Sequence, residues 1–431
     1  MRNNLLSLVL GVCLLVGCEA GTSSTGESDA ATVIVPTIVL SQDAPVTETP
    51  SPLVVTKPDD PLVVLLYRDG VLARTDVAGS AVEPVAKPLG AVGDTVWLYF
   101  WTNSPQISLD GRYLITSTSV SSSRGKWQVT DLQTGEEVAS GQGQSRLSPT
   151  WNPDSQQFAY LVEEQVCIFD LAEQTETCVT LAPDLIGASW SPAGDYIAVA
   201  QANFSEEGAT GQVWLLQTTT KTAEKIGTFE TPLEATVNDA FEWTDDGSGL
   251  LIKSTHEEVA SLLYRVDEGT TLPFSQPVHS LSPNGQYILY RAGAVGPVAG
   301  GIAYTLPVNE SCMQPKLGLH NWDWSPDGKN LAYLLSCAEV PLTSWLSVLN
   351  ASTGELLWQQ EIANLPGNTY PIEFVYWSPD GAYLLLDEPD ELYEGQRQLS
   401  PVWRVLADGS GLSEVVTDAG FLLGAVSQWE P

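Results

Sequence analysis

One short phrase recurs along the chain and constrains its fold more than any other feature. Its clearest copies read Trp-Ser-Pro-Asp-Gly, and each leads through a polar pair into a short apolar run. Proline presets φ, Asp bonds nearby amides and Gly adopts a positive φ, so the phrase predicts a tight turn between two strands. The clear copies are Trp324–Gly328, Trp377–Gly381 and Trp190–Gly194, and the weaker ones are Ile107–Gly111, Trp151–Ser155, Trp243–Gly247 and Leu281–Gly285.

The spacing of the phrase indicates a repeat architecture. Its last residue falls at 111, 155, 194, 247, 285, 328 and 381, so that successive copies lie 38 to 53 residues apart. Each copy is followed by a second hairpin signal, such as Trp127–Leu132 turning at Thr134–Gly135. A period near 45 residues with short strands and no helical pattern predicts an all-β protein, a β-propeller of four-stranded blades.

The two ends of the repeat region indicate how the ring closes. Leu62–Tyr67 and Val71–Asp76 form a hairpin that lacks a preceding strand, and Gln428–Pro431 looks like the phrase cut short. We therefore expect the C-terminal strand to complete the N-terminal blade, giving eight blades of about 46 residues each. A seven-bladed ring with an insertion at 94–102 is the alternative.

The phrase and its spacing resemble the WD-like repeats of the TolB-type propeller family, over about residues 61–431. This resemblance implies the fold and says little about function. Family members with an α/β domain before the propeller differ from this chain, in which only a spacer precedes residue 61. The Gly-x-Ser-x-Gly elbow of the hydrolase domain in prolyl oligopeptidase-type enzymes is also absent from the sequence.

The N-terminal segment predicts export. Arg2 precedes an apolar run from Leu5 to Val16, which is short for a membrane span and fits a secretory signal. The run ends in Leu15–Cys18, which resembles the bacterial lipoprotein signal, whose cysteine is diacylated. This implies a signal peptide at 1–17 and lipidation of Cys18. An ordinary signal peptide that contains a cysteine is the alternative.

Residues 18–60 predict a tether. The segment is rich in Ser, Thr and Pro and cannot bury enough apolar area to offset its conformational entropy. We expect it to hold a β-propeller domain, residues 61–431, away from the membrane. The protein would then be exported and lipid-anchored, facing the cell surface or the periplasm.

The charge balance excludes some partners. The 431 residues include 53 Asp and Glu but 18 Lys and Arg, a net charge of −35. Such a polyanion repels phosphate backbones and anionic lipid surfaces, which excludes nucleic acid binding and electrostatic membrane docking. It favours a basic partner or a weakly bound, unassigned cation. We expect a monomer.

Four cysteines remain once Cys13 is lost with the signal and Cys18 is acylated. Cys167 and Cys178 are equidistant from the turn of one hairpin, while Cys312 and Cys337 flank the phrase at 324–328. In an exported protein this predicts the disulfides Cys167–Cys178 and Cys312–Cys337. Four free thiols are the alternative.

No catalytic constellation stands out in the sequence. His256, His279 and His320 lie in different predicted blades, zinc-ligand spacings are absent, and we expect no metal site. Four aromatic residues fall between blades and form a candidate binding face for a sugar or peptide, although they can equally cap the core. These are Trp97, Tyr99, Phe100 and Trp101.

Two functions fit these observations. The first is a non-enzymatic lipoprotein whose propeller binds a protein, peptide or glycan, without a cofactor. The alternative is a propeller enzyme, such as a lactonase or lyase, with an acidic site on the axis. That alternative requires carboxylates and a histidine to converge on the axis, and the spacing of the histidines argues against it.

Overall fold

The structure is a computed structural model, and the residues that it describes form strands and turns without any helix. The chain divides into two units, 1–51 and 52–431, and all described residues belong to the second. No helix in this described part is long and apolar enough to cross a membrane. The described residues are 63–68, 71–77, 82–84, 106–119, 125–143, 149–205, 208–231, 241–253, 260–307, 321–337, 343–363, 365, 372, 374–387, 392–393, 396–397, 400–419 and 421–426.

The strands form eight four-stranded antiparallel sheets, numbered here as blades 1 to 8. The first four blades, each from its inner to its outer strand, are as follows. Blade 1 is β34 (Phe421–Val426), β1 (Val63–Arg68), β2 (Val71–Asp76) and β3 (Glu83–Pro84); blade 2 is β4 (Gln106–Ile107), β5 (Tyr113–Ser119), β6 (Gly125–Asp131) and β7 (Glu136–Gly143); blade 3 is β8 (Thr150–Trp151), β9 (Gln157–Val162), β10 (Gln165–Asp170) and β11 (Thr175–Thr180); blade 4 is β12 (Leu185–Trp190), β13 (Tyr196–Ser205), β14 (Gly208–Gln217) and β15 (Ala223–Thr231).

The other four blades follow the same order. Blade 5 is β16 (Phe241–Trp243), β17 (Gly249–Ile252), β18 (Leu262–Arg265) and β19 (Thr270–Pro273); blade 6 is β20 (Val278–Leu281), β21 (Tyr287–Tyr290), β22 (Ala294–Pro297) and β23 (Tyr304–Thr305); blade 7 is β24 (Trp322–Trp324), β25 (Asn330–Cys337), β26 (Thr343–Asn350) and β27 (Leu356–Ala363); blade 8 is β28 (Phe374–Trp377), β29 (Tyr383–Asp387), β32 (Ser400–Leu406) and β33 (Ser413–Ala419). A separate ribbon pairs β30 (Leu392–Tyr393) with β31 (Gln396–Arg397).

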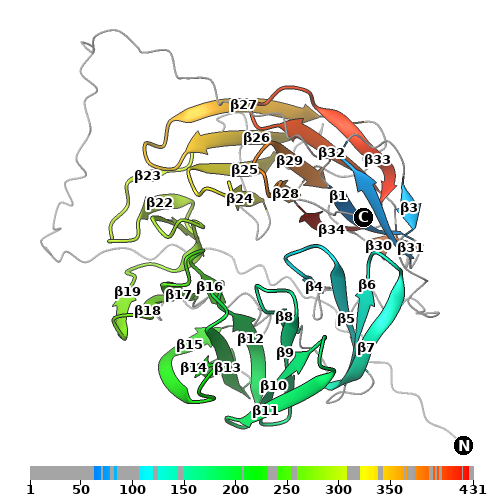
Figure 1. The fold of residues 1–431 in the computed structure, drawn as a ribbon. Coiled ribbons are helices and arrows are strands. Elements are labelled where there is room, and N and C mark those ends of the chain that lie inside the picture. The colour runs from blue at the N-terminus through cyan, green and yellow to red at the C-terminus, as the bar shows by residue number, and fades with distance from the viewer. Residues whose placement is uncertain are drawn as a thin grey trace, which may run out of the picture. The chain divides into compact units, whose positions relative to one another are not determined.

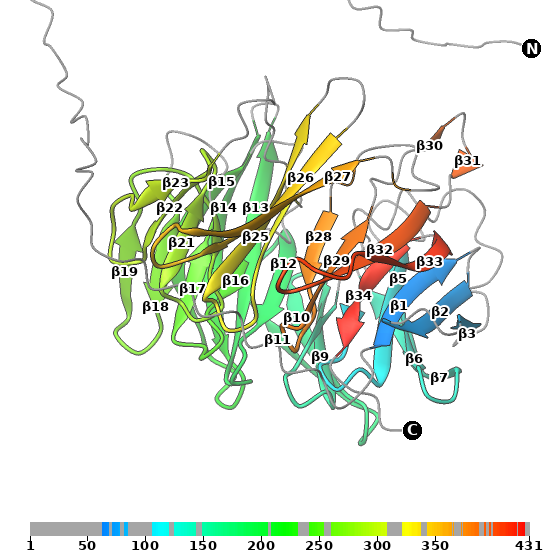
Figure 2. The same ribbon diagram turned by 90° about the horizontal axis from the view of Figure 1, so that it is seen from above.

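The predicted propeller with eight four-stranded blades is confirmed. Each of the seven phrases lies where an inner strand turns into the second strand of its blade, from β4 to β28. Figure 1 shows the blades succeeding one another around a central axis, with the inner strands nearest to it. The hairpins β13–β14 and β25–β26 are longer than most, and Figure 2 shows that both extend on the same side of the propeller.

The C-terminal strand completes the first blade, as the sequence predicted. β34 pairs antiparallel with β1, from Val63 opposite Val426 to Tyr67 opposite Phe421. The first blade therefore combines the two ends of the repeat region. The residues of the incomplete C-terminal phrase, Trp429–Pro431, lie outside the described residues.

Both faces of the blades are buried, because each sheet packs against two neighbours. Alternation along one strand shows how this works: Phe158 of β9 belongs to a core cluster shared with blade 2, whereas Ala159 belongs to the cluster shared with blade 4. Seven such clusters join blades 2 to 8 and then blade 8 to blade 1. Between blades 1 and 2 the described residues form no cluster, and the intervening segment 85–105 lies outside them.

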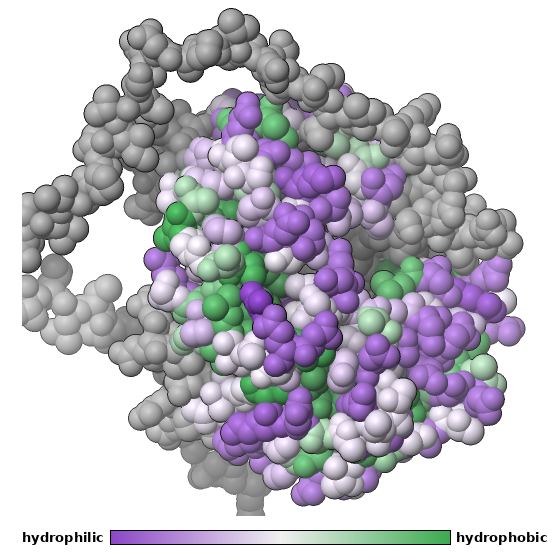
Figure 3. Space-filling view, turned by 60° about the vertical axis from the view of Figure 1, so that its left-hand side comes forward, coloured by the Kyte–Doolittle hydropathy of each residue, from purple (hydrophilic) through white to green (hydrophobic). Residues whose placement is uncertain are grey.

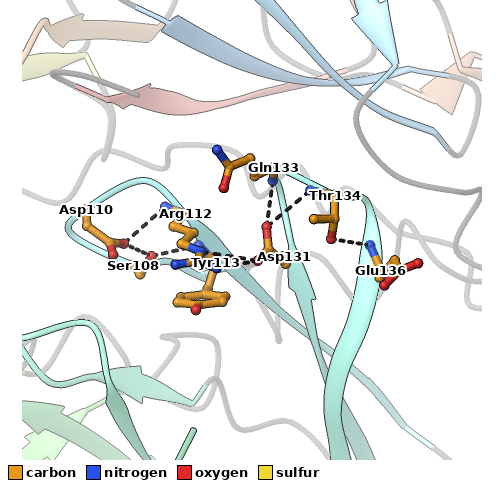
Figure 4. Close-up of polar contacts among 8 residues, drawn as sticks. All are labelled: Ser108, Asp110, Arg112, Tyr113, Asp131, Gln133, Thr134 and Glu136. Atoms are coloured by element: carbon orange, nitrogen blue, oxygen red, sulfur yellow. Dashed lines mark hydrogen bonds and ion pairs between the residues drawn. The ribbon is translucent and has the colours of Figure 1, made fainter. Parts of the chain in front are cut away.

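The phrase turn is stabilised by its own side chains. In blade 2 the hydroxyl of Ser108 donates to Oδ1 of Asp110 at 2.5 Å and accepts the N–H of Tyr113 at 2.8 Å (Figure 4). The N–H of Gly111 donates to the carbonyl oxygen of Ser108 at 2.8 Å. Equivalent Ser–Asp bonds occur in the phrases of blades 7 and 8, so these residues serve the turn rather than chemistry.

The outer hairpin of blade 2 closes by a related turn. Oδ1 of Asp131 accepts the N–H groups of Gln133 and Thr134, while Oδ2 accepts a bond from the guanidinium of Arg112 at 3.1 Å (Figure 4). The Asp131 side chain keeps only 5% of its surface exposed, so this ion pair is partly shielded from solvent. Through it the first turn of the blade is tied to the second hairpin.

Neighbouring phrase turns also touch one another. Asn284 of blade 6 donates from its side-chain amide to the carbonyl oxygen of Asp327 in blade 7, at 3.0 Å. Gly328 follows with φ of 65°, and a Cβ atom there would lie 2.5 Å from the Asn284 side chain. The glycine of the phrase is therefore required both by its backbone conformation and by the adjacent blade.

We predict that ending the chain at Ala419, which removes β34, lowers the free energy of unfolding by several kcal/mol. Each lost backbone hydrogen bond costs about 1 kcal/mol, and the inner edge of β1 is left unpaired. Thermal unfolding followed by circular dichroism measures the change. Adding a synthetic peptide of residues 420–431 should restore much of the melting temperature. An unchanged melting temperature in the truncated chain would contradict the role of β34.

Candidate functional site

Each inner strand leaves one edge without a strand partner, and side chains from the preceding blade bond to that edge. The residue directly before the phrase, here called the pre-phrase residue, performs this role in blades 3, 5 and 7. Thr150 of blade 3 accepts the backbone N–H of Trp190 in blade 4 through Oγ1, at 3.2 Å. Asp323 of blade 7 accepts the N–H of Trp377 in blade 8 through Oδ2, at 2.6 Å.

The phrase tryptophans reach back in the opposite direction. Nε1 of Trp377 donates to the carbonyl oxygen of Asp323 at 3.1 Å, and Nε1 of Trp151 donates to that of Gln106 at 3.0 Å. Nε1 of Trp324 donates to the hydroxyl of Ser280 at 2.7 Å. The phrase tryptophans of blades 3, 7 and 8 therefore pack between neighbouring blades.

Charged side chains gather on the inner edges of blades 5 to 7. Glu242 is the pre-phrase residue of β16, and its carboxylate accepts the backbone N–H of Leu281 in blade 6. Nζ of Lys253, which follows β17, lies 3.5 Å from Oε2 of Glu242. The Glu242 side chain keeps 28% of its surface exposed and the Lys253 side chain 18%, so both are partly buried and both still contact solvent.

An aromatic pair lies on the same inner strands. Nε1 of Trp322 in β24 donates to Nε2 of His279 in β20 at 2.5 Å, and the two rings lie 4.7 Å apart. In this bond Nε2 of His279 is the acceptor. We call Glu242, Lys253, His279, Trp322 and Asp323 the inner-edge cluster.

The carboxyl groups of the cluster resist ionisation. Burial raises the pKa of Asp323 to about 7, against the opposing effect of the N–H groups of Trp377 and Trp324, and the charge of Glu242 raises it further. Burial also raises the pKa of Glu242, which Lys253 opposes. The tyrosine beside them, Tyr376 of β28, has a raised pKa through burial and through the charges of Asp387 and Asp323. Near neutral pH such a cluster can exchange a proton or accept a cation.

One of the two predicted disulfides is observed. Cys167 of β10 lies directly opposite Cys178 of β11, with an S–S distance of 2.03 Å. The bond fixes the outermost strand of blade 3. Cys312 lies outside the described residues, as does the side chain of Cys337, and their disulfide stays a prediction.

The only group of three close metal-ligand atoms among the described residues includes this disulfide. It combines Cys167 and Cys178 with Glu176. The two sulfur atoms are bonded to each other, so neither is the thiolate that a metal would need. This group is therefore a structural crosslink in the present state.

The other predicted site residues are not described. Cys18 and the aromatic residues Trp97, Tyr99, Phe100 and Trp101 all lie outside the described residues. Of the three histidines only His279 is described, and it lies on the inner strand β20. Glu242, Lys253 and Asp323 were not among the predicted site residues. Two of these, Glu242 and Asp323, could have been found by aligning the pre-phrase residues, because the other residues at this position are uncharged.

The described surface offers no large apolar patch to explain binding. Its large exposed hydrophobic side chains are Leu109, Ile302 and Leu356, which belong to three different blades. In the view of Figure 3, hydrophilic side chains predominate and hydrophobic ones lie in small groups between them. The inner-edge cluster is therefore the most distinctive chemical feature of the described residues.

Comparisons with known proteins support the fold alone. No family model matches the chain, and no curated protein matches it either. A structure of a eukaryotic initiation factor is similar with a TM-score of 0.52 and 16% identity, covering 85% of this chain and 90% of its own. A structure of the dihydro-heme d1 dehydrogenase NirN in complex with DHE is similar with a TM-score of 0.50 and 14% identity. The similarity covers 87% of this chain and 79% of that one.

TolB from Acinetobacter baumannii is also among the similar structures. Its TM-score is 0.37 with 12% identity, covering 70% of this chain and 64% of its own. A similarity this low does not place the chain in the TolB family. Together with the strand topology, the first two structures establish a β-propeller.

We predict that Asp323→Asn stabilises the protein above neutral pH. The raised pKa means that Asp323 binds its proton more tightly in the folded state than in the unfolded state, where its pKa has the ordinary value of 3.8. Asp323 therefore contributes stability at acid pH that is lost as the pH rises through about 7. The amide oxygen of Asn can still accept the N–H of Trp377.

Urea unfolding at a series of pH values measures this effect. The stability gain of D323N should be largest above pH 7 and should fade towards pH 4. Asp408→Asn is the control of opposite sign, because hydrogen bonds from Ser410 lower the pKa of the exposed Asp408. A D323N variant whose stability parallels that of the wild type at every pH would contradict the assignment.

Proposed function

We propose that this protein is an exported lipoprotein, anchored through Cys18, whose propeller binds a protein, peptide or glycan partner. The observation that carries the binding role is the inner-edge cluster, which places charged and aromatic side chains on an otherwise structural repeat. The lipoprotein-like Leu15–Cys18 and the Pro-rich segment up to residue 60 support the anchor. The net charge of −35 favours a basic partner.

The geometry of the cluster supports binding more directly than catalysis. Glu242 and Asp323 are both held by backbone N–H groups of the next blade, so their positions are set before any ligand arrives. Preorganised side chains lose little entropy on binding. Two carboxylates, an imidazole and an indole offer hydrogen bonding, charge and a flat apolar face to a partner.

A second candidate is a lactonase- or lyase-like enzyme that uses the same cluster. It is favoured by the pKa of about 7 at Asp323, since carboxyl groups with raised pKa act as general acids or bases near neutral pH. Glu242, His279 and Asp323 lie on three successive inner strands, which is the placement that an axial site would need. Turnover of lactones or uronic acid glycans by the wild type and its loss in D323N would establish this candidate.

We predict that Cys18→Ser abolishes lipid attachment. The wild-type chain should incorporate labelled palmitate in a bacterial host and sediment with the membranes. The variant lacks the acceptor sulfur and should carry no label. Cys13→Ser is the matched control and should retain the label. Labelling of C18S as strong as that of the wild type would refute the anchor.

We predict that the native partner is captured by crosslinking in intact cells. The full-length protein carrying a C-terminal affinity tag should retain one partner specifically after detergent extraction. Raising the salt concentration should weaken capture, because the acidic surface attracts a basic partner. A tagged, unrelated lipoprotein serves as the control. Recovery of the same molecules with both proteins would contradict a binding role.

A further inference from the structure

Two cysteines and a carboxylate meet on the outer hairpin of blade 3. Cys167 of β10 lies directly opposite Cys178 of β11, and their sulfur atoms are bonded to each other. Glu176 lies two residues before Cys178 and therefore on the same face of β11. Its Oε1 atom is 3.0 Å from Sγ of Cys178, and the three ligand atoms all lie within 4.8 Å of one another. We call these three residues the hairpin group.

The contact between Glu176 and Cys178 has no donor while the disulfide is closed. A sulfur atom within a disulfide carries no proton, so Oε1 of Glu176 faces it without a hydrogen bond. When the bond is opened, the thiol of Cys178 can donate to the carboxylate at the same distance. A metal ion can also bridge the two atoms. The contact therefore becomes favourable only in the reduced state.

A second contact positions Glu176. Its other carboxylate oxygen, Oε2, accepts the hydroxyl of Tyr160 in β9 at 2.5 Å. Tyr160 lies opposite Cys167 in the strand pairing, so this bond crosses from the outermost strand over β10. Burial and the bond to Glu176 raise the pKa of Tyr160, so its hydroxyl keeps its proton and remains a donor. Carboxylates that bind metals are held by outer hydrogen bonds of this kind.

The disulfide is not needed to hold the hairpin together. Six residue pairs already align β10 with β11, from Gln165 opposite Thr180 to Asp170 opposite Thr175. The two cysteines are 11 residues apart, so their bond closes a short loop that the turn closes as well, and the stabilisation by a crosslink grows with loop length. Among the described residues no other outer hairpin carries a disulfide. We therefore expect the fold to tolerate opening of this bond.

The exposed side of the disulfide is open to a reductant. β11 is the outermost strand of blade 3 and Cys178 is partly exposed, whereas Cys167 is 1% exposed and lies in the core shared with blade 2. A thiolate of a small dithiol attacks Sγ of Cys178, which forms a mixed disulfide and releases Cys167. The second thiol then displaces Cys178 and closes the reductant to its own disulfide. Two electrons and two protons pass from the dithiol to the two cysteines.

We propose that reduction converts the hairpin group into a zinc site, in which Cys167, Cys178 and Glu176 bind one Zn²⁺ ion and water takes the fourth position. Zinc binds thiolates and carboxylates at about 2.0–2.3 Å in a tetrahedron, so its ligand atoms lie about 3–4 Å apart. The atoms of the hairpin group reach this spacing through small side-chain rotations. Thiolates select zinc or copper(I), and the harder carboxylate favours zinc. The two thiol protons are released when the ion binds. Such a site is independent of the proposed partner binding and goes beyond it.

The test uses the full chain in detergent, reduced with a phosphine and then desalted without oxygen. Cobalt(II) is the probe, because its thiolate complexes give a charge-transfer band, and zinc binds more tightly and displaces it. Cys167→Ser/Cys178→Ser removes both sulfur ligands and keeps the other cysteines, so it reports any ion that they bind. Glu176→Gln removes the charge of the carboxylate. Glu173→Gln removes a charge from the exposed turn of the same hairpin and is the matched control.

We expect the reduced wild type to bind one cobalt ion more than the double cysteine variant and to show the charge-transfer band. The oxidised wild type should lack that band. E176Q should lose about tenfold or more in affinity, whereas E173Q should match the wild type. Circular dichroism shows whether each variant is folded. If the double cysteine variant fails to fold, Cys178→Ser takes its place.

Three results would overturn the proposal. The first is that the reduced wild type and the cysteine variant bind the same number of cobalt ions. The second is a disulfide that stays closed in the folded protein, which alkylation followed by mass spectrometry detects. The third is an E176Q variant that binds cobalt as tightly as the wild type, because Glu176 would then not be a ligand.

Discussion

The fold depends on the need to cover both faces of every sheet. The strands of these blades are apolar on each side, as Phe158 and Ala159 of β9 show by facing different neighbours. A sheet of this kind cannot be stable alone, because one face would always remain exposed to water. Arranging the blades around an axis gives each face a neighbour, and the pairing of β34 with β1 joins the last strand to the first blade.

The same arrangement creates a second constraint at the axis. Inner strands have one edge without a strand partner, and its N–H groups need acceptors. The chain meets part of this need with pre-phrase side chains, which accept N–H groups of the next blade between blades 3 and 4 and between blades 7 and 8. The indole of Trp377 donates to a carbonyl oxygen across the second of these junctions. At the axis, a substitution can therefore introduce a charged group without breaking the bond between two blades. Asp323 illustrates this, because it makes with a carboxylate the same bond that Thr150 makes with a hydroxyl.

The fold was predictable because its determinants are local. The phrase at Trp324–Gly328 specifies a turn through Pro, Asp and Gly within five residues, and its seven copies specify seven of the eight blades. The eighth followed from the incomplete hairpin and the incomplete phrase at the two ends of the repeat region. The Cys167–Cys178 disulfide was predictable for the same reason, since the hairpin register follows from the turn. The inner-edge cluster was not, because Glu242, His279 and Asp323 come from three blades. How side chains of three inner strands lie relative to one another depends on the stagger of the blades, which no short segment encodes.

Placing carboxylates at the inner edge links ligand binding to stability. Glu242 and Asp323 have raised pKa values, so near neutral pH their ionisation lowers the stability of the folded state. A cation bound there would favour the ionised carboxylates, and the stability would rise with the logarithm of its concentration once that concentration exceeds its Kd. A substitution that made the propeller more stable by neutralising these groups would weaken the site at the same time. The bonds between blades hold the inner strands in place. The free-energy cost of the ionised carboxylates is therefore confined to the inner edge, and the apolar cores between the blades compensate for it.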